Sequence, residues 1–249
     1  IDNVKIKCEA CAAAGLENTM SRVPEVVDCW VESGSMPFAE LHAPFENEEL
    51  RKQRYPADFV SEYIPQTRAW FYVMHVLGTI LFGKEPFKNV ATTGTVLAED
   101  GSKMSKSKNN FPDPALVIEN FGMDAVRYYL LASPVITGED LSFSEKSVAE
   151  VNRKLSVILW NVMSFYRMYT QEKVDTSVVP QSENILDKWV LSRLAATHKT
   201  VTESLDKYAT PAAARAIQDF VTELSTWYTR RSRDRIKEGG EQAQQALKV

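Results

Sequence analysis

The sequence is poor in several features that would each mark a class of protein. Cysteine occurs only three times in 249 residues, an odd and small number that argues against a disulfide framework. No apolar run approaches the roughly 18 residues of a membrane-spanning helix, and no signal peptide opens the chain. Neither the P-loop nor the dinucleotide-binding glycine motif is present. We therefore expect a cytoplasmic protein with no membrane partner.

An excess of one charge is also lacking. The formal net charge is −4, from 29 basic and 33 acidic residues. This balance does not predict a nucleic-acid partner, but such binding depends on where positive charge is concentrated. A hydrophobic content of 44% in a chain of this length suffices for one large or two modest domains.

The most informative segment is Lys103–Ser107, which reads Lys-Met-Ser-Lys-Ser. The β-branched run Asn89–Ala98 before it predicts a strand, and Asp113 followed by Pro114 predicts the start of a helix. The segment should therefore lie on a loop, where a lysine ammonium can follow a moving phosphate as negative charge develops. These features indicate polyphosphate chemistry. The motif alone leaves open an ordinary solvated loop.

The first 95 residues alternate between strand-like and helix-like segments. Arg68–Phe82 is an apolar helical stretch closed by Gly83, and it leads into the strand at Asn89–Ala98. Because ligands of open α/β sheets bind at the carboxyl ends of strands, Thr93 and Gly94 should lie near a nucleotide. Glycine at this position suits either a close approach to a base or ribose, or a bend of the strand.

From Ser142 onward the pattern becomes helical. Ser142–Glu145 is a candidate capping box, and apolar residues then recur every three or four positions from Val148 to Tyr166. After a linker at Val174–Ser182, a second helix is outlined between Ile185 and Leu205, and a third begins at Thr210–Pro211. The second part of the chain should be a helical bundle.

Positive charge is concentrated near the end of the third helix. Its arginines can neutralise RNA phosphates, or they can pair with acidic neighbours and complement a helix C-terminus. The cluster consists of Arg230, Arg231, Arg233 and Arg235, with Lys237 beyond them.

A different candidate site is Cys8-x-x-Cys11. The spacing suits metal ligands, but one pair is only half of a zinc site. Two free thiols or a damaged half of a zinc ribbon are favoured over a site that a second pair upstream of Ile1 would complete.

Lys103–Ser107 matches the KMSKS signature of class I aminoacyl-tRNA synthetases, and further segments resemble the isoleucyl-tRNA synthetase family. Asp28–Pro37 is similar to the family's aspartate-x-Trp-x-acid-Ser-Gly segment. Tyr55–Asp58 and Gln66–Phe71 resemble the stretch that borders the aminoacyl-adenylate, and Trp227–Arg233 resembles a segment of the anticodon-binding domain. The resemblance covers nearly the whole chain, with the segments in the family's order.

The resemblance implies a ligase that uses ATP and Mg²⁺ to activate L-isoleucine as the adenylate and then transfers it to tRNA(Ile). Lys103 and Lys106 would stabilise the departing pyrophosphate. The resemblance also implies residues that bind the nucleotide, the amino acid and the tRNA. Met104, Ser105, Ser107, Thr93 and Gly94 would lie at the nucleotide, Glu62 at the amino group, Gln66 at the ribose, Trp30 and Trp70 in the apolar pocket, and the four arginines at tRNA.

The chain departs from the family in two respects. His42, His75 and His198 are isolated and none belongs to an H-x-G-H motif, and the editing insertion is missing. We therefore expect part of a longer, monomeric enzyme: the second half of a Rossmann-type α/β catalytic domain (1–98), the KMSKS loop with connecting helices (99–141), and a partial α-helical anticodon-binding bundle (142–249). The alternatives are a sister synthetase for valine, leucine or methionine, and a non-catalytic RNA-binding protein built from synthetase parts.

Overall fold

The computed structural model describes residues 5–16, 19–20, 25, 28–169 and 182–238. The chain forms two compact units, one from Ile1–Asp58 and Pro65–Lys88, the other from Phe59–Ile64 and Asn89–Val249. These boundaries differ from the three ranges expected from the sequence, whose division stays a prediction. The linker expected at Val174–Ser182 lies outside the described residues, apart from Ser182. No helix in the described ranges is long and apolar enough to cross a bilayer.

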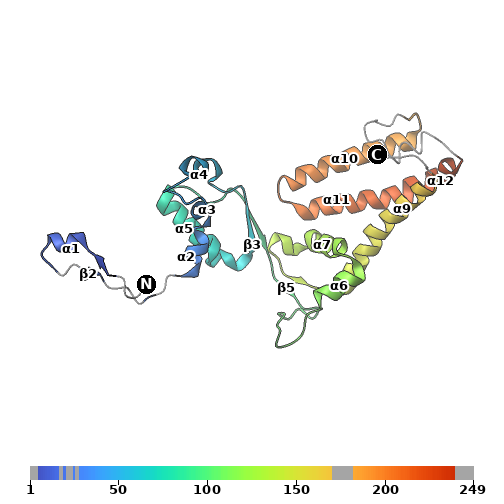
Figure 1. Cartoon of the computed structure of the whole chain (residues 1–249). Coiled ribbons are helices and arrows are strands. Elements are labelled where there is room, and N and C mark those ends of the chain that lie inside the picture. The colour runs from blue at the N-terminus through green and yellow to red at the C-terminus, as the bar shows by residue number, and fades with distance from the viewer. Residues whose placement is uncertain (1–4, 17–18, 21–24, 26–27, 170–181, 239–249) are drawn as a thin grey trace. The chain divides into compact units, whose positions relative to one another are not determined.

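The first unit is mainly helical (Figure 1). Its strands β1 (Ile6–Lys7) and β2 (Thr19–Met20) form a short antiparallel pair. Its helices are α1 (Glu9–Ala13), α2 (Cys29–Gly34), α3 (Met36–Ala39), α4 (Glu48–Arg54) and α5 (Trp70–Phe82), the last preceded by the 3-10 turn η1 (Ile64–Arg68), most of which belongs to this unit.

Helix α5 confirms the apolar helix expected in this region. It ends at Gly83, whose φ of 62° is left-handed and suits glycine at a helix C-terminus. Helix α2 packs against α5, because a Cβ at Gly34 would lie only 2.9 Å from the Val73 Cγ1 atom. The glycine of the Ser-Gly segment therefore permits close contact between two helices.

The second unit contains two pairs of parallel strands. Strand β3 (Val60–Tyr63) pairs with β4 (Val90–Thr93), and β5 (Val96–Leu97) pairs with β6 (Leu141–Ser142). The single strand expected over Asn89–Ala98 is wrong in extent, since the chain leaves the ladder between β4 and β5. There Gly94 N–H donates to the Val135 carbonyl oxygen at 2.7 Å.

A small helical layer follows the strands. It comprises α6 (Pro114–Phe121), α7 (Met123–Ala132), the 3-10 turn η2 (Pro134–Thr137) and α8 (Glu145–Val151), around a core of Val117, Ala125 and Val148. The Asp113 cap of α6 is confirmed, because its carboxylate accepts from Ala115 N at 2.8 Å.

The capping box expected at Ser142–Glu145 is wrong. Ser144 is the N-cap residue of α8, and its hydroxyl bonds the Glu99 carboxylate at 3.3 Å instead of capping the helix.

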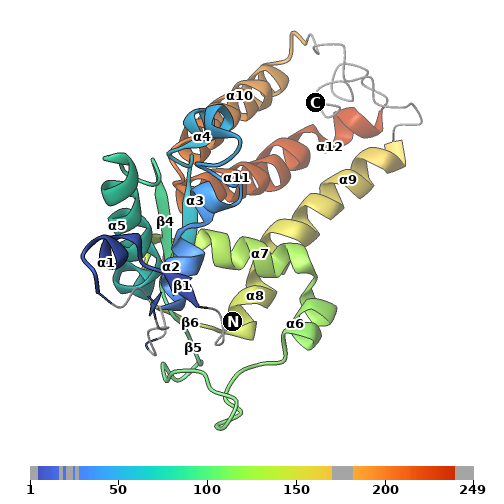
Figure 2. The ribbon, with the colours of Figure 1, turned by 60° about the vertical axis from the view of Figure 1, so that its left-hand side comes forward.

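The three bundle helices are confirmed in position (Figure 2). The first continues α8 through the π-helical turn η3 (Asn152–Ser156) into α9 (Val157–Tyr169); the second is α10 (Ile185–Leu205); the third runs through α11 (Thr210–Glu223), the π-helical turn η4 (Leu224–Thr229) and α12 (Arg230–Lys237). Val190 of α10 and Tyr228 of η4 form the buried centre of their contact. The chain is thus an α/β region followed by a helical bundle.

Candidate functional site

The Lys103–Ser107 segment lies on a loop between β5 and α6, as expected (Figure 2). A tight turn leads into it. Gly101 has a φ of 79°, and Ala98 N–H donates to the Ser102 carbonyl oxygen at 2.8 Å. Leu97 and Lys103 form an isolated antiparallel bridge, so the first lysine is fixed close to the end of β5.

Asn110 holds the loop from its far end. Its Oδ1 accepts from Ser105 N at 2.9 Å, and its Nδ2 donates to the Ser102 hydroxyl at 3.0 Å and the Lys103 carbonyl at 3.2 Å. One amide side chain therefore joins both sides of the segment. Ser105 adds a hydroxyl contact with Ser107 at 3.3 Å. Sequence reasoning missed Asn110; the only signal was an amide residue directly after the motif.

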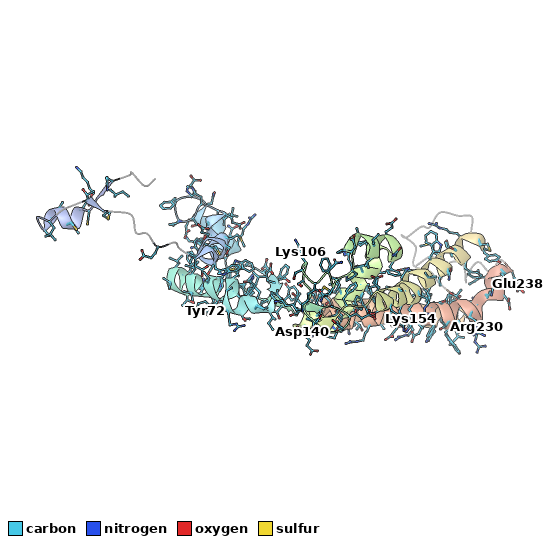
Figure 3. The ribbon with its side chains drawn as sticks, turned by 90° about the horizontal axis from the view of Figure 1, so that it is seen from below. Tyr72, Lys106, Asp140, Lys154, Arg230 and Glu238 are labelled. Carbon is cyan, nitrogen blue, oxygen red and sulfur yellow. The ribbon has the colours of Figure 1, made fainter. Side chains whose placement is uncertain are left out.

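Both lysines of the motif are exposed. Neither has an ion-pair partner among the described residues, and Lys106, labelled in Figure 3, extends from the middle of the loop. Two ammonium groups without carboxylate partners suit the binding of an anionic ligand, because no internal ion pair has to be broken first.

Met104 faces the protein between the two exposed lysines. Its side chain helps to line an apolar cavity of about 250 Å³, together with Val96, Phe111 and residues of α6 and α7. The Met104 side chain is thus partly occupied by packing, while Lys103 and Lys106 on either side of it remain in solvent.

The strand-end candidates lie on β3 and β4. The two parallel strands run in register to Tyr63 and Thr93, so Thr93 and Gly94 follow a carboxyl end as predicted. Glu62 is exposed next to this end. At Gly94, a Cβ would lie 2.0 Å from the Glu139 carbonyl oxygen. The close approach is therefore made by the chain's own backbone, which is a structural reason for glycine that neither sequence interpretation contained.

Three candidates lie in the first unit. The Gln66 Oε1 atom accepts from Trp70 N at 3.0 Å, so it caps the start of α5. The Trp70 indole N–H donates to the Ser33 carbonyl oxygen at 3.1 Å and thereby ties α5 to α2. Trp30 is half-buried on α2. The Gln66 carbonyl oxygen and the Trp70 indole N–H are thus used in hydrogen bonds within the protein. The contacts of both residues with a ligand stay predictions.

Cys8 and Cys11 lie close together around the start of α1. Cys11 N–H donates to the Cys8 Sγ atom at 3.4 Å, and this bond lowers the pKa of the Cys8 thiol. Both are free thiols, and no group of three or more potential metal ligands occurs in the described part of the chain. Two sulfur atoms supply half of a tetrahedral zinc site, so the observed residues do not fit a complete one.

Three of the four candidate RNA-binding arginines are exposed on α12: Arg230, Arg231 and Arg233. The Arg231 guanidinium lies 4.9 Å from the ring centroid of Trp227. Arg230, labelled in Figure 3, and Arg233 help to line a cavity of about 210 Å³ between α9 and α12. Cations beside exposed aromatic rings suit a nucleic-acid backbone with unpaired bases.

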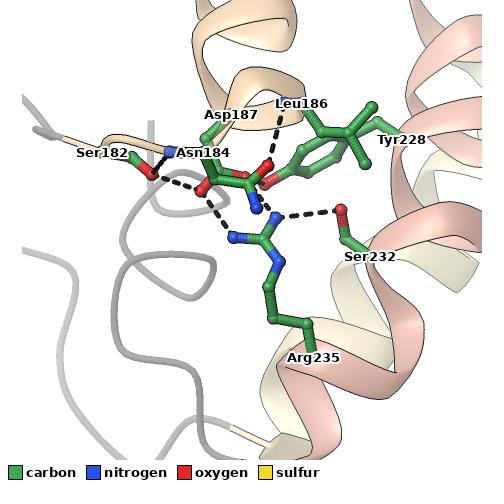
Figure 4. A network of polar contacts seen from close by, with 7 residues as sticks. All are labelled: Ser182, Asn184, Leu186, Asp187, Tyr228, Ser232 and Arg235. Carbon is green, nitrogen blue, oxygen red and sulfur yellow. Dashed lines mark hydrogen bonds and ion pairs between the residues drawn. The ribbon is translucent and has the colours of Figure 1, made fainter.

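Arg235 differs from the other three in its contacts, and its binding to tRNA stays a prediction. Its guanidinium forms a two-pronged ion pair with the buried Asp187 carboxylate, at 2.6 and 2.8 Å (Figure 4). Pairing with an acidic residue was one of the two sequence interpretations, but the partner lies far away in the chain. Sequence reasoning missed Asp187, whose only signal was an acid between apolar helix positions.

Comparison with known families agrees with this geometry. Residues 3–144 match the model for class I tRNA synthetases of isoleucine, leucine, methionine and valine. Residues 187–249 match the anticodon-binding domain of tRNA ligases. The first match contains the KMSKS loop and the two parallel strand pairs, β3–β4 and β5–β6, and the second begins at Asp187.

Individual relatives share substantial sequence with the chain. It is 45% identical to an isoleucine–tRNA ligase of Clostridium kluyveri over 95% of its length. It is also 45% identical to that of Bacillus thuringiensis over 99%, and 42% identical to isoleucine–tRNA ligase 2 of Pseudomonas fluorescens over 96%. The chain spans only 22–23% of the length of these relatives.

Solved structures show the same fold at lower identity. Methionyl-tRNA synthetase of Mycobacterium tuberculosis, bound by methionyl-adenylate, superposes with a TM-score of 0.71 at 23% identity, over 95% of this chain and 49% of that one. LeuRS of Agrobacterium radiobacter, in a ternary complex with tRNA and LeuAMS, gives a TM-score of 0.68 at 21% identity, over 98% and 30%.

Proposed function

Because this chain belongs to the class I tRNA synthetase family of isoleucine, leucine, methionine and valine, we propose that it contributes the second catalytic half and the start of the anticodon-binding region of an isoleucine–tRNA ligase. The observation that carries the proposal is the loop with two unpaired lysines, which follows a strand and is held by Asn110. The high identity to isoleucine–tRNA ligases favours isoleucine within the family.

In the proposed reaction the isoleucine carboxylate attacks the α-phosphorus of ATP. The bond from that phosphorus to the bridging oxygen breaks, and pyrophosphate leaves with the electron pair. Lys103 and Lys106 would stabilise the charge that develops on the leaving group, because their ammonium groups are free to move towards it. The terminal adenosine hydroxyl of tRNA then takes the aminoacyl group and releases AMP.

The other candidate residues would hold the adenylate. Glu62 would pair with the ammonium of isoleucine, and Gln66 would bond the ribose through its Nε2 group, since its Oε1 already caps α5. Thr93 and Gly94 would contact the nucleotide at the end of β4. Trp30 and Trp70 would form flat walls of the apolar side-chain pocket.

Magnesium is proposed to enter with ATP as part of the substrate. Mg²⁺ is usually bound through substrate phosphates with one or two carboxylates, and the described residues contain no group of three or more potential metal ligands. We assign no step to a protein-bound metal. The proposed partners are tRNA(Ile), ATP and isoleucine, and the proposed enzyme is a cytoplasmic monomer.

The decisive test compares two lysines of the same loop in the longer enzyme that carries this chain. Lys106→Ala should slow isoleucine-dependent ATP–pyrophosphate exchange by about 100-fold or more, the usual cost of losing one transition-state contact. Its affinity for an unreactive isoleucyl-adenylate analogue should change little. Lys108→Ala, also exposed, is the matched control and should stay within about twofold.

Three outcomes would contradict parts of this proposal. Equal losses of exchange and analogue binding would show that Lys106 binds the ground state. Exchange driven by leucine, methionine or valine in preference to isoleucine would identify a sister enzyme. Binding of tRNA with no exchange from the longer protein would favour a non-catalytic RNA-binding function.

A further inference from the structure

Asp187 is a fully buried carboxylate at the start of α10, in the second unit. Its four hydrogen bonds come from Ser182, just before α10, and from the η4–α12 segment (Figure 4). The Ser182 hydroxyl donates to Oδ2 at 2.6 Å, and the Tyr228 hydroxyl donates to Oδ1 at 2.8 Å. The two terminal nitrogens of Arg235 donate as well, Nη1 to Oδ2 and Nη2 to Oδ1. Both carboxylate oxygens are therefore saturated by donors of the chain itself.

Charge and burial show that these contacts stabilise the ionised carboxylate. Burial by itself would raise the pKa of Asp187, but the bonds from Arg235, Ser182 and Tyr228 outweigh it and hold that pKa below its ordinary value. Burial and the Asp187 bond raise the pKa of Tyr228. A buried ion pair of this kind becomes costly as soon as one partner is removed.

The helical periodicity of the last segment explains what the pair controls. Tyr228, Ser232 and Ile236 are all fully buried and follow one another at four-residue steps, and Arg235 lies on the same side. Arg230 lies opposite this buried face, Arg231 and Arg233 lie on the two flanks of the helix, and all three are exposed. The direction of these arginines is therefore set by the face of the helix that is attached to α10.

We propose that the Asp187–Arg235 ion pair is a positioning device, which holds α12 on α10 so that the side of the helix that carries Arg230, with Arg231 and Arg233 on its flanks, faces RNA. This inference rests on the RNA-binding function proposed above. Helix α12 is only eight residues long and mostly polar, with Ser232 and Ile236 as its buried contacts. Because α12 continues η4, the ion pair extends the attachment to α10 by about two helical turns beyond the buried Tyr228.

The alternative is that Arg235 itself contacts a phosphate. The two roles predict opposite results for Asp187→Asn, which removes the carboxylate charge and keeps the side-chain size. A direct contact would be strengthened or unchanged, because the substitution frees the guanidinium. A positioning role predicts weaker RNA binding, by about tenfold, as the loss of one or two phosphate contacts would cause at physiological salt.

The experiment measures binding of fluorescently labelled tRNA(Ile) to the full-length protein, for the Asp187→Asn and Arg235→Gln variants and for the double variant. Arg235→Gln alone leaves a buried carboxylate unpaired and should weaken binding by about tenfold or more. Adding Asp187→Asn should restore binding to within about threefold, since the two amides can pair without charge. Equal losses in Arg235→Gln and the double variant, with no loss in Asp187→Asn, would overturn the proposal.

Two further measurements separate this inference from the function on which it rests. Arg230→Gln should weaken tRNA binding and reduce the salt slope by about 1, without changing amide exchange in residues 224–238. Asp187→Asn and Arg235→Gln should each speed that exchange without RNA, and the double variant should restore it. Normal tRNA binding by variants of Arg230, Arg231 and Arg233 would refute the proposal that this side of α12 binds RNA. Unchanged amide exchange would refute the positioning role.

Discussion

At the scale of single residues, two positions tolerate the least change. At one there is no space for a larger side chain, and at the other every hydrogen-bond acceptor is already used. Gly94 is one such position, because the backbone of Glu139 fills the space of a side chain. Asp187 is another, since all of its acceptor positions are used. Both residues lie in the second unit, and both have consequences that can be measured.

Gly94→Ala should destabilise the second unit by about 1–3 kcal/mol, the usual cost of inserting atoms into a filled space. Urea unfolding followed by circular dichroism measures this change. Gly83→Ala is the comparison, because its left-handed φ costs about 1–2 kcal/mol while the space around it is open. A Gly94→Ala protein as stable as the parent would show that the strand junction can move away from Glu139.

Asp187 should also leave a signature in the acid limb of the stability curve. The pKa of Asp187 in the folded protein lies below the ordinary value near 3.9. Its contribution to the free energy of unfolding is therefore complete above that value. The contribution is lost as the pH falls through the folded pKa. Asp187→Asn should therefore be less stable at pH 7, and its stability should fall less steeply below about pH 4. Parallel acid limbs for parent and variant would contradict this.

At the scale of elements, short polar contacts decide where the KMSKS loop begins and ends. Asp113 caps α6 where the loop ends, and Asn110, three residues earlier, reaches back to Ser102, Lys103 and Ser105 where the loop begins. The loop is thus held by its borders, while its lysines remain free in solvent. A loop with this construction combines a defined path of the backbone with mobile cationic side chains.

Removing the Asp113 cap should cost about 1 kcal/mol in Asp113→Ala, with Asp113→Asn retaining most of the stability. The measurement is the midpoint of urea unfolding, with the dependence of the unfolding free energy on urea concentration unchanged. Glu119→Ala on the same helix is exposed and should change stability by no more than about 0.5 kcal/mol. If both alanine variants behave alike, the bond to Ala115 contributes nothing to the helix.

Asn110→Ala removes three hydrogen bonds that hold the loop. We expect faster amide exchange at Ser105, whose N–H loses its acceptor, and slower ATP–pyrophosphate exchange in the longer enzyme. Asn109→Ala is a demanding comparison, since its φ of 47° is itself left-handed. Unchanged exchange at Ser105 in Asn110→Ala would show that the loop keeps its path without the amide.

At the scale of the whole molecule, the chain combines matches to two domains of tRNA ligases in sequence order. The synthetase match ends at residue 144 and the anticodon-binding match starts at residue 187. Between them, α8 and α9 run as one helix through the π-helical turn η3, so the α/β region and the bundle share a continuous element within the second unit.

The proposal of a half-site makes a prediction for the chain by itself. With isoleucine, valine and leucine in parallel, folded protein of these 249 residues should catalyse no ATP–pyrophosphate exchange above background, because the H-x-G-H histidines of the family are absent from it. A complete synthetase serves as the positive control. Exchange specific to isoleucine would show that this chain assembles a full activation site without those histidines.

The sequence by itself determined the family, the KMSKS loop between strand and helix, the position of α5 and the three bundle helices. Those features depend on local patterns: helical periodicity, the caps at Asp113 and Gly83, and a contiguous motif. Only the tertiary structure decided the reason for Gly94, the role of Asn110 and the separation of Arg235 from its neighbours. Each of these depends on a partner that other parts of the chain bring into contact, such as Asp187, which lies 48 positions from Arg235. A local sequence pattern cannot predict a contact between residues so far apart in the chain.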